Sequence, residues 1–306
     1  MAPSTASSQT TQLEVVRVPG WSGRSKPALG WLIHGFSTRV GGGTTVYRPG
    51  NLDLNLGFTD SDDRQTVAAN RELFVTVASE GKEILGLVTL RQIHSSLIWR
   101  VSAKDIRENG MPALLKGDGL MTDEPGVLLG IQTADCIPVL VADRKQRAVA
   151  AFHAGWRGTL ARIVENGVGR MRLEFGSRPQ DLIASIGPGI GQCCYAVGEE
   201  VQQQFESQFQ YAPELFREVY DADPVRQKYP MLFLTARAPG HSDIGPGMHL
   251  DLAEANRRQL LAAGLRKGAI FLTGQCTGCR TDRFFSHRTE RGFTGRMMSV
   301  IGVARA

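Results

Sequence analysis

Apolar residues recur along this chain with two different spacings, and the two alternate from one end to the other. Residues 61–80 begin with Ser and Asp and then carry apolar side chains at about the 3.6-residue spacing of an amphipathic helix. The same spacing predicts further helices over 157–176, 197–209 and 249–265, the last one after a strand end. Gly167 and Gly169 weaken the helical pattern of the first of these three segments.

Runs of β-branched and apolar residues predict the strands. Residues 126–156 hold two or three buried strands, with a turn at 143–146 before the last of them. Residues 86–102 form a strand that breaks near Ser95 and Ser96. Further strands are predicted over 29–43, 181–192 and 269–273, and the first two of these lead into glycine-rich turns.

The C-terminal segment, 284–304, has the pattern of a β-hairpin closed by a turn at 289–292. Residues 1–11 are rich in Ser and Thr without any periodicity, which predicts a disordered tail. One long loop-like segment, 235–249, could be a lid or a surface loop. The long run of strands with turn-sized connections favours a mixed α/β (α+β) fold over a regular βαβ repeat.

Composition and charge narrow the classes of function. The 306 residues carry a net charge of +5, yet no run of four or more Lys/Arg occurs, so we expect no nucleic-acid partner. The positive excess fits either small anionic ligands such as phosphate or a solubilising surface. Apolar runs stay shorter than a membrane span, the N-terminus lacks the features of a secretory signal, and the five cysteines are an odd number. We therefore expect a cytoplasmic protein without membrane contact.

Three residues share one local pattern, in which a metal-binding side chain lies at a strand end or break beside small residues. They are His94 in "RQIHSS", Cys136 in "QTADCIP" and His153 in "AAFHAGW". Two imidazoles and a thiolate suit Zn²⁺ with a fourth position open. Their separations of 42 and 17 residues form no helical ligand motif. A buried structural cysteine with two hydrogen-bonded histidines explains the same residues, so the pattern alone leaves both interpretations open.

The Asp135-Cys136 pair offers further chemistry. A carboxylate inside an apolar run is costly unless it is paired or hydrogen-bonded. Asp135 could therefore act as a general base, orient a metal-bound histidine, or cap the strand end. Cys136 could instead be a nucleophile that His94 or His153 activates, because a nucleophile and a metal ligand both require the thiolate.

One glycine motif and one cysteine motif are weaker indications of function. Gly187, Gly189 and Gly191 follow a strand, but they lack the helix start and the acidic residue of a dinucleotide-binding site, so a tight turn near a ligand fits better. Cys276 and Cys279 form a single CxxC motif. Without a second pair or nearby histidines, this motif is a poor zinc site.

Four arginines stand beside Gly, Ser or Thr, where a guanidinium can meet phosphate or carboxylate. They are Arg39, Arg157, Arg288 and Arg296. Arg157 also lies just before a predicted helix N-terminus, which is itself an anion site. We expect one or two of the four to bind substrate.

Taken in order, "HGFSTRVGG", "RQIHSS", "TADC", "HAGWRG", "GPGIGQCCYAVG" and "CTGCRTDRFFSHR" resemble the laccase-domain family, formerly called multicopper polyphenol oxidases and now purine nucleoside phosphorylases. The resemblance extends over about residues 30–304. It implies a single catalytic domain over 12–306, built of packed mixed β-sheets with outer helices and similar to the cytotoxic-necrotizing-factor/laccase-domain fold. Ser95 departs from the glycine that often follows the first histidine of the family.

The resemblance also implies the site and the reaction. The family's metal ligands match His94, Cys136 and His153, with zinc favoured over copper. The implied activities are phosphorolysis of adenosine, inosine, guanosine and methylthioadenosine to base and ribose 1-phosphate, and deamination of adenosine. Asp135 would move a proton, and Arg39, Arg157 or Arg288 would position phosphate. The partners are then purine nucleosides and phosphate, and the protein is a monomer or homodimer.

Three alternatives remain. A copper oxidase of the laccase type needs many histidines with His-X-His pairs, and this chain has six histidines and no such pair. A metal-free cysteine hydrolase would use Cys136 with His94 or His153. A ligand-binding protein would bind nucleoside without turnover.

Overall fold

The computed structural model of the chain describes residues 13–21, 29–108, 111, 113–219 and 247–305. The predicted tail over 1–11 and nearly all of the predicted loop over 235–249 lie outside these residues. Within them, no helix is both long enough and apolar enough to cross a membrane.

The first β-sheet is mixed. Its strands, in spatial order, are β1 (Val15–Val16), β2 (Leu32–Ser37), β15 (Met297–Val303), β7 (Val127–Thr133) and β4 (Gly86–Thr89). Neighbours run antiparallel except for β4 and β7, which pair in parallel. The short strand β3 (Val40–Thr44) lies beside this sheet and bridges to Asp53.

The second sheet is also mixed, and a third is small. The second runs in the order β14 (Ile270–Leu272), β10 (Leu182–Ile186), β8 (Ile137–Asp143), β9 (Val149–Ala154), β6 (Gly119–Thr122) and β5 (Ile98–Arg100). Its two outer pairs are parallel and its inner pairs antiparallel. The third sheet consists of β11 (Ala196–Val197), β13 (Gly247–Leu250) and β12 (Phe216–Val219).

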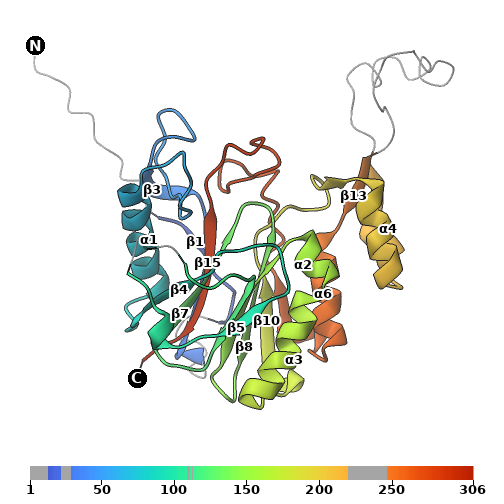
Figure 1. Cartoon of the computed structure of the whole chain (residues 1–306), viewed down its shortest axis with the longest axis horizontal. Helices are drawn as coiled ribbons and strands as arrows, with labels where there is room; N and C mark the ends of the chain where they lie inside the picture. Colours follow the sequence, from blue (N-terminus) through green and yellow to red (C-terminus); the bar gives the residue numbers. More distant parts are fainter. Residues whose placement is uncertain (1–12, 22–28, 109–110, 112, 220–246, 306) are drawn as a thin grey trace, which may run out of the picture.

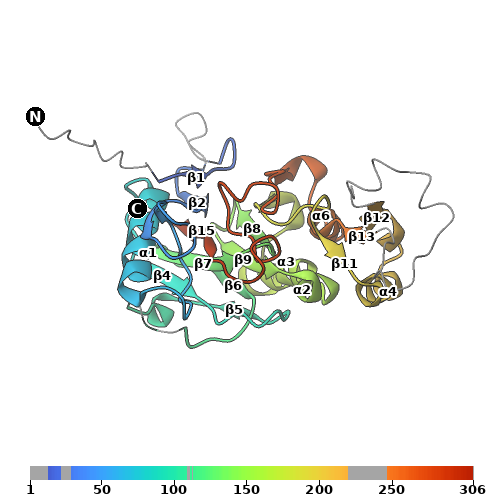
Figure 2. The ribbon, with the colours of Figure 1, turned by 90° about the horizontal axis from the view of Figure 1, so that it is seen from above.

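Helices cover the outer faces of the two large sheets. In Figures 1 and 2, α1 lies on one side of the strands and α2, α3 and α6 lie on the other. The helices are α1 (Arg64–Ser79), α2 (Trp156–Leu160), α3 (Ile163–Phe175), α4 (Glu199–Gln208) and α6 (Leu252–Ala262). Asp63 caps α1, because its carboxylate accepts a hydrogen bond from the amide of Thr66 at 2.8 Å.

The alternation of side chains along the central strands explains the layers. On β9, Val149 and Ala151 pack between the two sheets, whereas Ala150 and Phe152 pack against the helices of the second sheet. On β15, Ile301 points between the sheets and Val300 points to the opposite face, which packs with residues of α1. Both sheets are therefore buried on both faces, in a four-layer arrangement of helix, sheet, sheet and helices. The mixed α/β class predicted from the sequence is confirmed.

The predicted helix over 157–176 is two helices. Arg162 has φ 57°, in the left-handed region, and separates α2 from α3. Gly167 has a packing role, since a Cβ there would lie 2.2 Å from the ring of Phe152. Glycine therefore lets α3 approach β9 closely. The prediction of one continuous helix was wrong because sequence periodicity does not register a single left-handed residue.

The predicted hairpin over 284–304 is also wrong. Only β15 forms in the described part of this segment, and both of its edges are occupied, by β2 and β7. The preceding residues form a loop organised around Glu290, whose carboxylate accepts hydrogen bonds from the amide of Ser286 at 2.9 Å and the hydroxyl of Thr294 at 2.6 Å. A returning strand had no open edge on which to pair.

Two connections cross from the first sheet to the second at one end of the molecule. The break predicted near Ser95 spans residues 90–97, and it separates β4 of the first sheet from β5 of the second. Residues 134–136 likewise connect β7 to β8. His94 and Cys136 lie in these two crossings, so the topology itself places them together.

Candidate functional site

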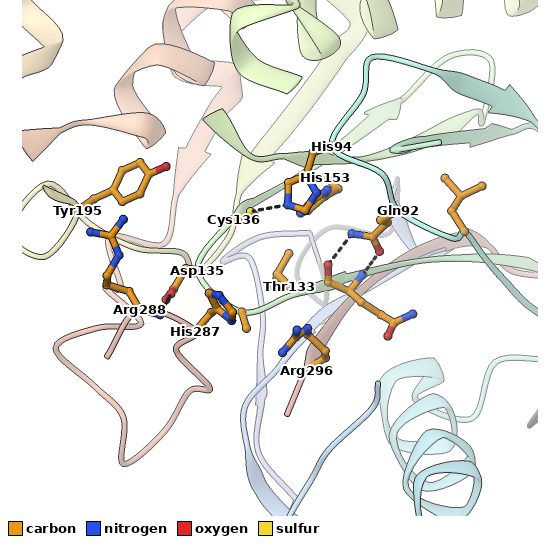
Figure 3. Close-up of a pocket in the computed structure, with 13 residues that line it drawn as sticks. Gln92, His94, Thr133, Asp135, Cys136, His153, Tyr195, His287, Arg288 and Arg296 are labelled. Atoms are coloured by element: carbon orange, nitrogen blue, oxygen red, sulfur yellow. Dashed lines mark hydrogen bonds between the residues drawn. The ribbon is translucent and has the colours of Figure 1, made fainter. Parts of the chain in front are cut away.

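The three predicted metal ligands meet at this end of the sheets. His94 comes from the β4–β5 crossing, Cys136 from the β7–β8 crossing and His153 from β9. Their ligand atoms all lie within 4.8 Å of one another. Cys136 Sγ is 3.9 Å from His94 Nε2, and the two imidazole rings meet edge to face at 4.9 Å between centroids (Figure 3).

Asp118 holds two of these ligands in place. Its buried carboxylate accepts hydrogen bonds from the His94 amide at 3.0 Å and from His153 Nδ1 at 2.8 Å. The amide and hydroxyl of Ser95 donate to the same group at 2.6 and 2.7 Å. Because Nδ1 of His153 is occupied, its Nε2 remains for the cluster. Ser95 therefore contacts Asp118, and it is not among the residues that line the cavity beside the cluster.

The sequence reasoning missed Asp118. Its signal was present, since "GDG" (117–119) places a carboxylate between glycines at the start of an apolar strand. Such a carboxylate is stable only when several donors reach it. The same reasoning that singled out Asp135 applied equally to Asp118.

Electrostatics within the cluster favour a charged pair. Burial raises the pKa of Cys136, but the neighbouring imidazoles of His153 and His94 outweigh burial and lower it. Burial lowers the pKa of His153, but the Cys136 sulfur and the Asp118 carboxylate outweigh it and raise this pKa. Burial also raises the pKa of Asp118, yet the hydrogen bonds from His153 and Ser95 bring it down to about 2. Asp118 is therefore ionised at neutral pH.

Backbone strain and close packing surround the same cluster. His94 has φ 59° and Asp135 has φ 92°, values that residues other than glycine rarely adopt. Such strain costs about 1–3 kcal/mol per residue and concentrates at functional sites. Gly155 has no room for a side chain, since a Cβ there would lie 3.0 Å from Cys136 Sγ and 3.1 Å from His94 Cδ2.

The donor set fits a metal ion. Two imidazole nitrogens and a thiolate, one of the imidazoles oriented by a carboxylate, are the ligands expected of a catalytic zinc site with an open position. The open side faces a cavity of about 430 Å³. Besides the three ligands, its polar lining includes Gln92, Gln132, Tyr195, His287, Arg288 and Arg296. In Figure 3, Tyr195 and Arg288 stand on one side of the cluster and Gln92 on the other.

Asp135 lines this cavity with both carboxylate oxygens already engaged. Oδ1 accepts a hydrogen bond from the hydroxyl of Thr277 at 2.6 Å, and Oδ2 accepts one from the amide of Arg288 at 2.7 Å. The carboxylate joins three loops beside the cluster, as a cap of the strand end would. Of the roles considered for Asp135, that of orienting His153 is filled by the carboxylate of Asp118.

The structure separates the candidate arginines. Arg39 is fully buried, and its guanidinium pairs with Asp53 at 2.8 Å and Glu290 at 2.9 Å, away from the cavity lining. Arg157 is exposed, stacks on the ring of Trp156 at 4.3 Å and does not line the cavity. Of the residues that we predicted to position phosphate, only Arg288 lies at the cavity.

Arg288 and Arg296 are both among the residues that line the cavity. Arg288 stacks over the ring of Tyr195 at 5.3 Å, and its Nη1 donates to the carbonyl of Ala196 at 2.6 Å. Arg296 donates from Nη1 to the carbonyl of Thr294 at 3.0 Å. Neither is paired with a carboxylate among the described residues.

The glycine loop after β10 packs against the core. A Cβ at Gly187 would lie 2.2 Å from the ring of Phe36, and one at Gly189 would lie 2.4 Å from Ile137. Close packing therefore accounts for glycine at both positions.

Comparison with known proteins identifies the family of this chain. The family described as "Multi-copper polyphenol oxidoreductase laccase" matches residues 33–304. "Purine nucleoside phosphorylase YlmD" of Geobacillus stearothermophilus is 35% identical over 288 residues, covering 92% of this chain and 94% of the relative. "Adenosine deaminase RL5", from an unknown prokaryotic organism, is 32% identical over 276 residues, covering 86% and 93%.

Comparison with solved structures shows the same fold in two proteins of similar sequence. The chain is similar to the hypothetical protein YfiH of Bacillus licheniformis, with a TM-score of 0.73, 34% identity, and coverage of 90% of this chain and 94% of that one. It is also similar to YlmD from Geobacillus stearothermophilus, with a TM-score of 0.72 and 32% identity over 91% and 94% of the two chains.

Proposed function

The chain belongs to the multi-copper polyphenol oxidoreductase laccase family, and from this premise we propose that it is a zinc-dependent purine nucleoside enzyme. Its reactions are phosphorolysis of adenosine, inosine, guanosine and methylthioadenosine to base and ribose 1-phosphate, and deamination of adenosine. The observation that carries the proposal is the convergence of His94, Cys136 and His153 on the floor of a polar cavity.

His94 Nε2, Cys136 Sγ and His153 Nε2 are the atoms that would hold the zinc ion. When bound, zinc supplies a Lewis acid that polarises oxygen and lowers the pKa of water at the open position. Asp118 acts through His153, because it fixes the tautomer and raises the basicity of the ligating nitrogen. Asp118 is thus a positioning residue.

Phosphate binds at the arginine side of the cavity. In phosphorolysis, a phosphate oxygen forms a bond to the anomeric carbon, the bond from that carbon to the purine nitrogen breaks, and the base leaves after gaining a proton. Arg288 and Arg296 line the cavity, and neither has a carboxylate partner among the described residues, so their guanidinium groups offer N–H donors to the anion. Arg39 is removed from the proposed set because its donors are taken by Asp53 and Glu290.

Tyr195 binds substrate as a hydrogen-bond donor. Burial raises the pKa of its phenol, so the hydroxyl keeps its proton at neutral pH and can donate to a sugar or phosphate oxygen. Arg288 lies over the Tyr195 ring and orients it. Asp135 holds the Arg288 backbone in place, and its proton-transfer role stays a prediction.

The second candidate is a metal-free cysteine hydrolase. The observation that favours it is the 3.9 Å separation of Cys136 Sγ from His94 Nε2, a nucleophile and base within reach of each other. Iodoacetamide separates the two functions. In the hydrolase it inactivates the enzyme whether or not zinc is present, whereas in the zinc enzyme bound metal protects Cys136.

The deciding experiment combines metal content with turnover. The purified protein is analysed for metals by mass spectrometry and incubated with adenosine, with and without phosphate, while chromatography follows the products. Loss of about one zinc ion per chain in Cys136→Ala, together with phosphate-dependent release of adenine or formation of inosine by the wild type, supports the proposal. Protein without metal and without nucleoside turnover contradicts it and favours the hydrolase. Bound copper with oxidation of phenols would instead support the oxidase that the family name describes.

A further inference from the structure

Four cysteines meet beside the pocket, at a place that the sequence analysis regarded as a poor zinc site. The CxxC motif of Cys276 and Cys279 lies against Cys193 and Cys194 of the glycine loop, and all four sulfurs are within 4.8 Å of one another. The expectation that this motif lacks a second pair was wrong. The partner pair is more than 80 positions away in the sequence, so only the fold shows it.

The backbone of the two loops is built to bring the sulfurs together. Gly189 and Cys276 form a parallel bridge, and the amide of Thr277 donates to the carbonyl of Gly189 at 3.0 Å. The amide of Gly191 donates to Cys276 Sγ at 3.2 Å, a hydrogen bond that favours a thiolate. This hydrogen-bonded contact fixes the separation of the loops without any bond between sulfurs.

Two glycines keep the space among the sulfurs open. A Cβ at Gly191 would lie 3.2 Å from Cys193 Sγ and 3.3 Å from Cys276 Sγ. A Cβ at Gly278 would lie 3.1 Å from Cys194 Sγ. Neither glycine has a positive φ, so close approach to the cysteines is what requires glycine here.

The distances fit four ligands around one ion better than two disulfides. Cys279 Sγ is 3.4 Å from both Cys193 Sγ and Cys194 Sγ, so no unique pair is formed. In a tetrahedral zinc site with Zn–S bonds of about 2.3 Å, neighbouring sulfurs are about 3.8 Å apart. The observed sulfurs are close to that spacing, and small rotations about the Cα–Cβ bonds bring them to it.

We propose that Cys193, Cys194, Cys276 and Cys279 bind a second metal ion, a structural zinc with four sulfur ligands, separate from the cluster of His94, Cys136 and His153. The site has no open position, so its role is to join loops. Tyr195 follows Cys194 directly, and Thr277, inside the CxxC motif, donates to Asp135. The ion therefore fixes the wall of the cavity on which Tyr195 and Arg288 stand. This site does not depend on the proposed activity.

The first test leaves all four cysteines intact. Cys136→Ser removes a ligand of the other site, and the metal that remains is examined by X-ray absorption after purification under reducing conditions. We expect about one zinc per chain with four sulfur neighbours and no nitrogen. The proposal is overturned if this variant retains no zinc, if the remaining metal has nitrogen ligands, or if peptide mapping of alkylated protein finds a disulfide among the four cysteines.

The second test removes the sulfurs. Cys276→Ser/Cys279→Ser should lower the zinc content of the wild type from two ions to one per chain, and circular dichroism checks that the variant is folded. The zinc that remains should have a mixed nitrogen and sulfur shell. Unchanged zinc content in this variant also overturns the proposal. In the wild type, absence of nucleoside turnover with both zinc ions bound would contradict the proposed function and leave the four-cysteine site intact.

Discussion

The described residues form two clusters of side chains able to bind metal, and the two differ in burial and in the number of donors. His153, Cys136 and His94 lie at the floor of a cavity of about 430 Å³, and His153 is only 4% exposed. Cys193 and Cys279 are exposed, and the four sulfurs of their cluster lie within 4.8 Å of one another. Three donors beside a cavity leave a coordination position for substrate, whereas four donors leave none. The difference assigns chemistry to the first cluster and loop joining to the second.

The two clusters are also held by different means. The first comes from three strands or crossings of the central sheets, and the Asp118 carboxylate fixes two of its ligands without any metal. The second comes from two surface loops that share one bridge and a few backbone hydrogen bonds. The fold therefore holds two residues of the first cluster through a buried carboxylate, whereas the loops of the second are held by one backbone contact and, as proposed, by the ion. Removal of metal should disturb the loops around 189–195 and 275–279 more than the sheet ends.

The largest expected effect is that of Cys136→Ala. Loss of the thiolate should remove zinc from the site of His94, Cys136 and His153, which we call the three-donor site. Phosphorolysis and deamination should then fall by more than about 100-fold, which exceeds the usual cost of losing a residue that only orients a ligand. Metal analysis and product chromatography on the same sample give both quantities. Cys279→Ser is the matched control, and it should reduce turnover far less while it also loses one zinc. Full activity in a Cys136→Ala protein that has lost the zinc of this site would remove the basis of the comparison.

Asp118→Asn comes next. The neutral amide side chain has one oxygen acceptor and no charge, so it orients His94 and His153 less well than the carboxylate does. We therefore expect zinc affinity at the three-donor site and turnover to fall by about 10- to 100-fold. Zinc at the four sulfurs should be unchanged, since Asp118 does not contact them. Titration with a zinc chelator measures both affinities in one experiment. Equal weakening of both sites would show that the substitution damages the fold and not one cluster.

The pKa of Asp118 adds a pH test. Its folded value of about 2 lies below the ordinary value of about 3.9, so the ionised carboxylate stabilises the fold above about pH 4. This contribution is lost as the pH falls from about 4 to about 2. In metal-free protein, wild type should lose stability in that window more steeply than Asp118→Asn, as followed by denaturant unfolding. Parallel curves for the two proteins would mean that Asp118 is not ionised in the fold.

The sequence predicted one cluster and missed the other for a physical reason. His94, Cys136 and His153 each stand at a strand end or break, a local feature that periodicity reveals, and the family resemblance implied that the three form one set of ligands. The pairing of Cys193 and Cys194 with the CxxC motif depends on a contact between distant loops, and no local pattern encodes it. The same limit explains the hairpin error at 284–304, because the occupied edges of β15 belong to strands far away in the sequence.

The arginines show the same limit for single side chains. A glycine or serine neighbour identified Arg39 as well as Arg288, but burial decides between them. The guanidinium of Arg39 is paired with Asp53 and Glu290, whereas Arg288 lines the cavity. Asp118 was predictable from the residues around it, since a carboxylate at the start of an apolar strand requires donors. The sequence could predict that such groups need partners, but it could not predict which partners they find.

Arg288→Gln tests the wall between the two clusters. A charged hydrogen bond contributes about 1.5–3 kcal/mol, so we expect the KM for phosphate to rise by about 10- to 100-fold. Deamination uses no phosphate and should fall less than phosphorolysis. Arg157→Gln is the control, because Arg157 is exposed outside the cavity, and it should change the KM for phosphate little. Steady-state kinetics at varied phosphate measures both. An equal rise in the KM for phosphate in both variants would mean that phosphate does not bind at Arg288.

The smallest and most symmetrical test inserts one methyl group beside each cluster. Gly155→Ala places a Cβ 3.0 Å from Cys136 Sγ, and Gly191→Ala places one 3.2 Å from Cys193 Sγ. Overpacking of this kind costs about 1–3 kcal/mol, so each variant should weaken zinc about tenfold at its own cluster and leave the other unchanged. Gly169→Ala controls for glycine replacement, since its Cβ meets nothing within 4 Å in α3 and should slightly stabilise the fold. Chelator titration of the three variants reads each cluster separately. If Gly191→Ala weakened only the three-donor site, the sulfurs would not be binding an ion of their own, and the loops would act on the cavity through packing alone.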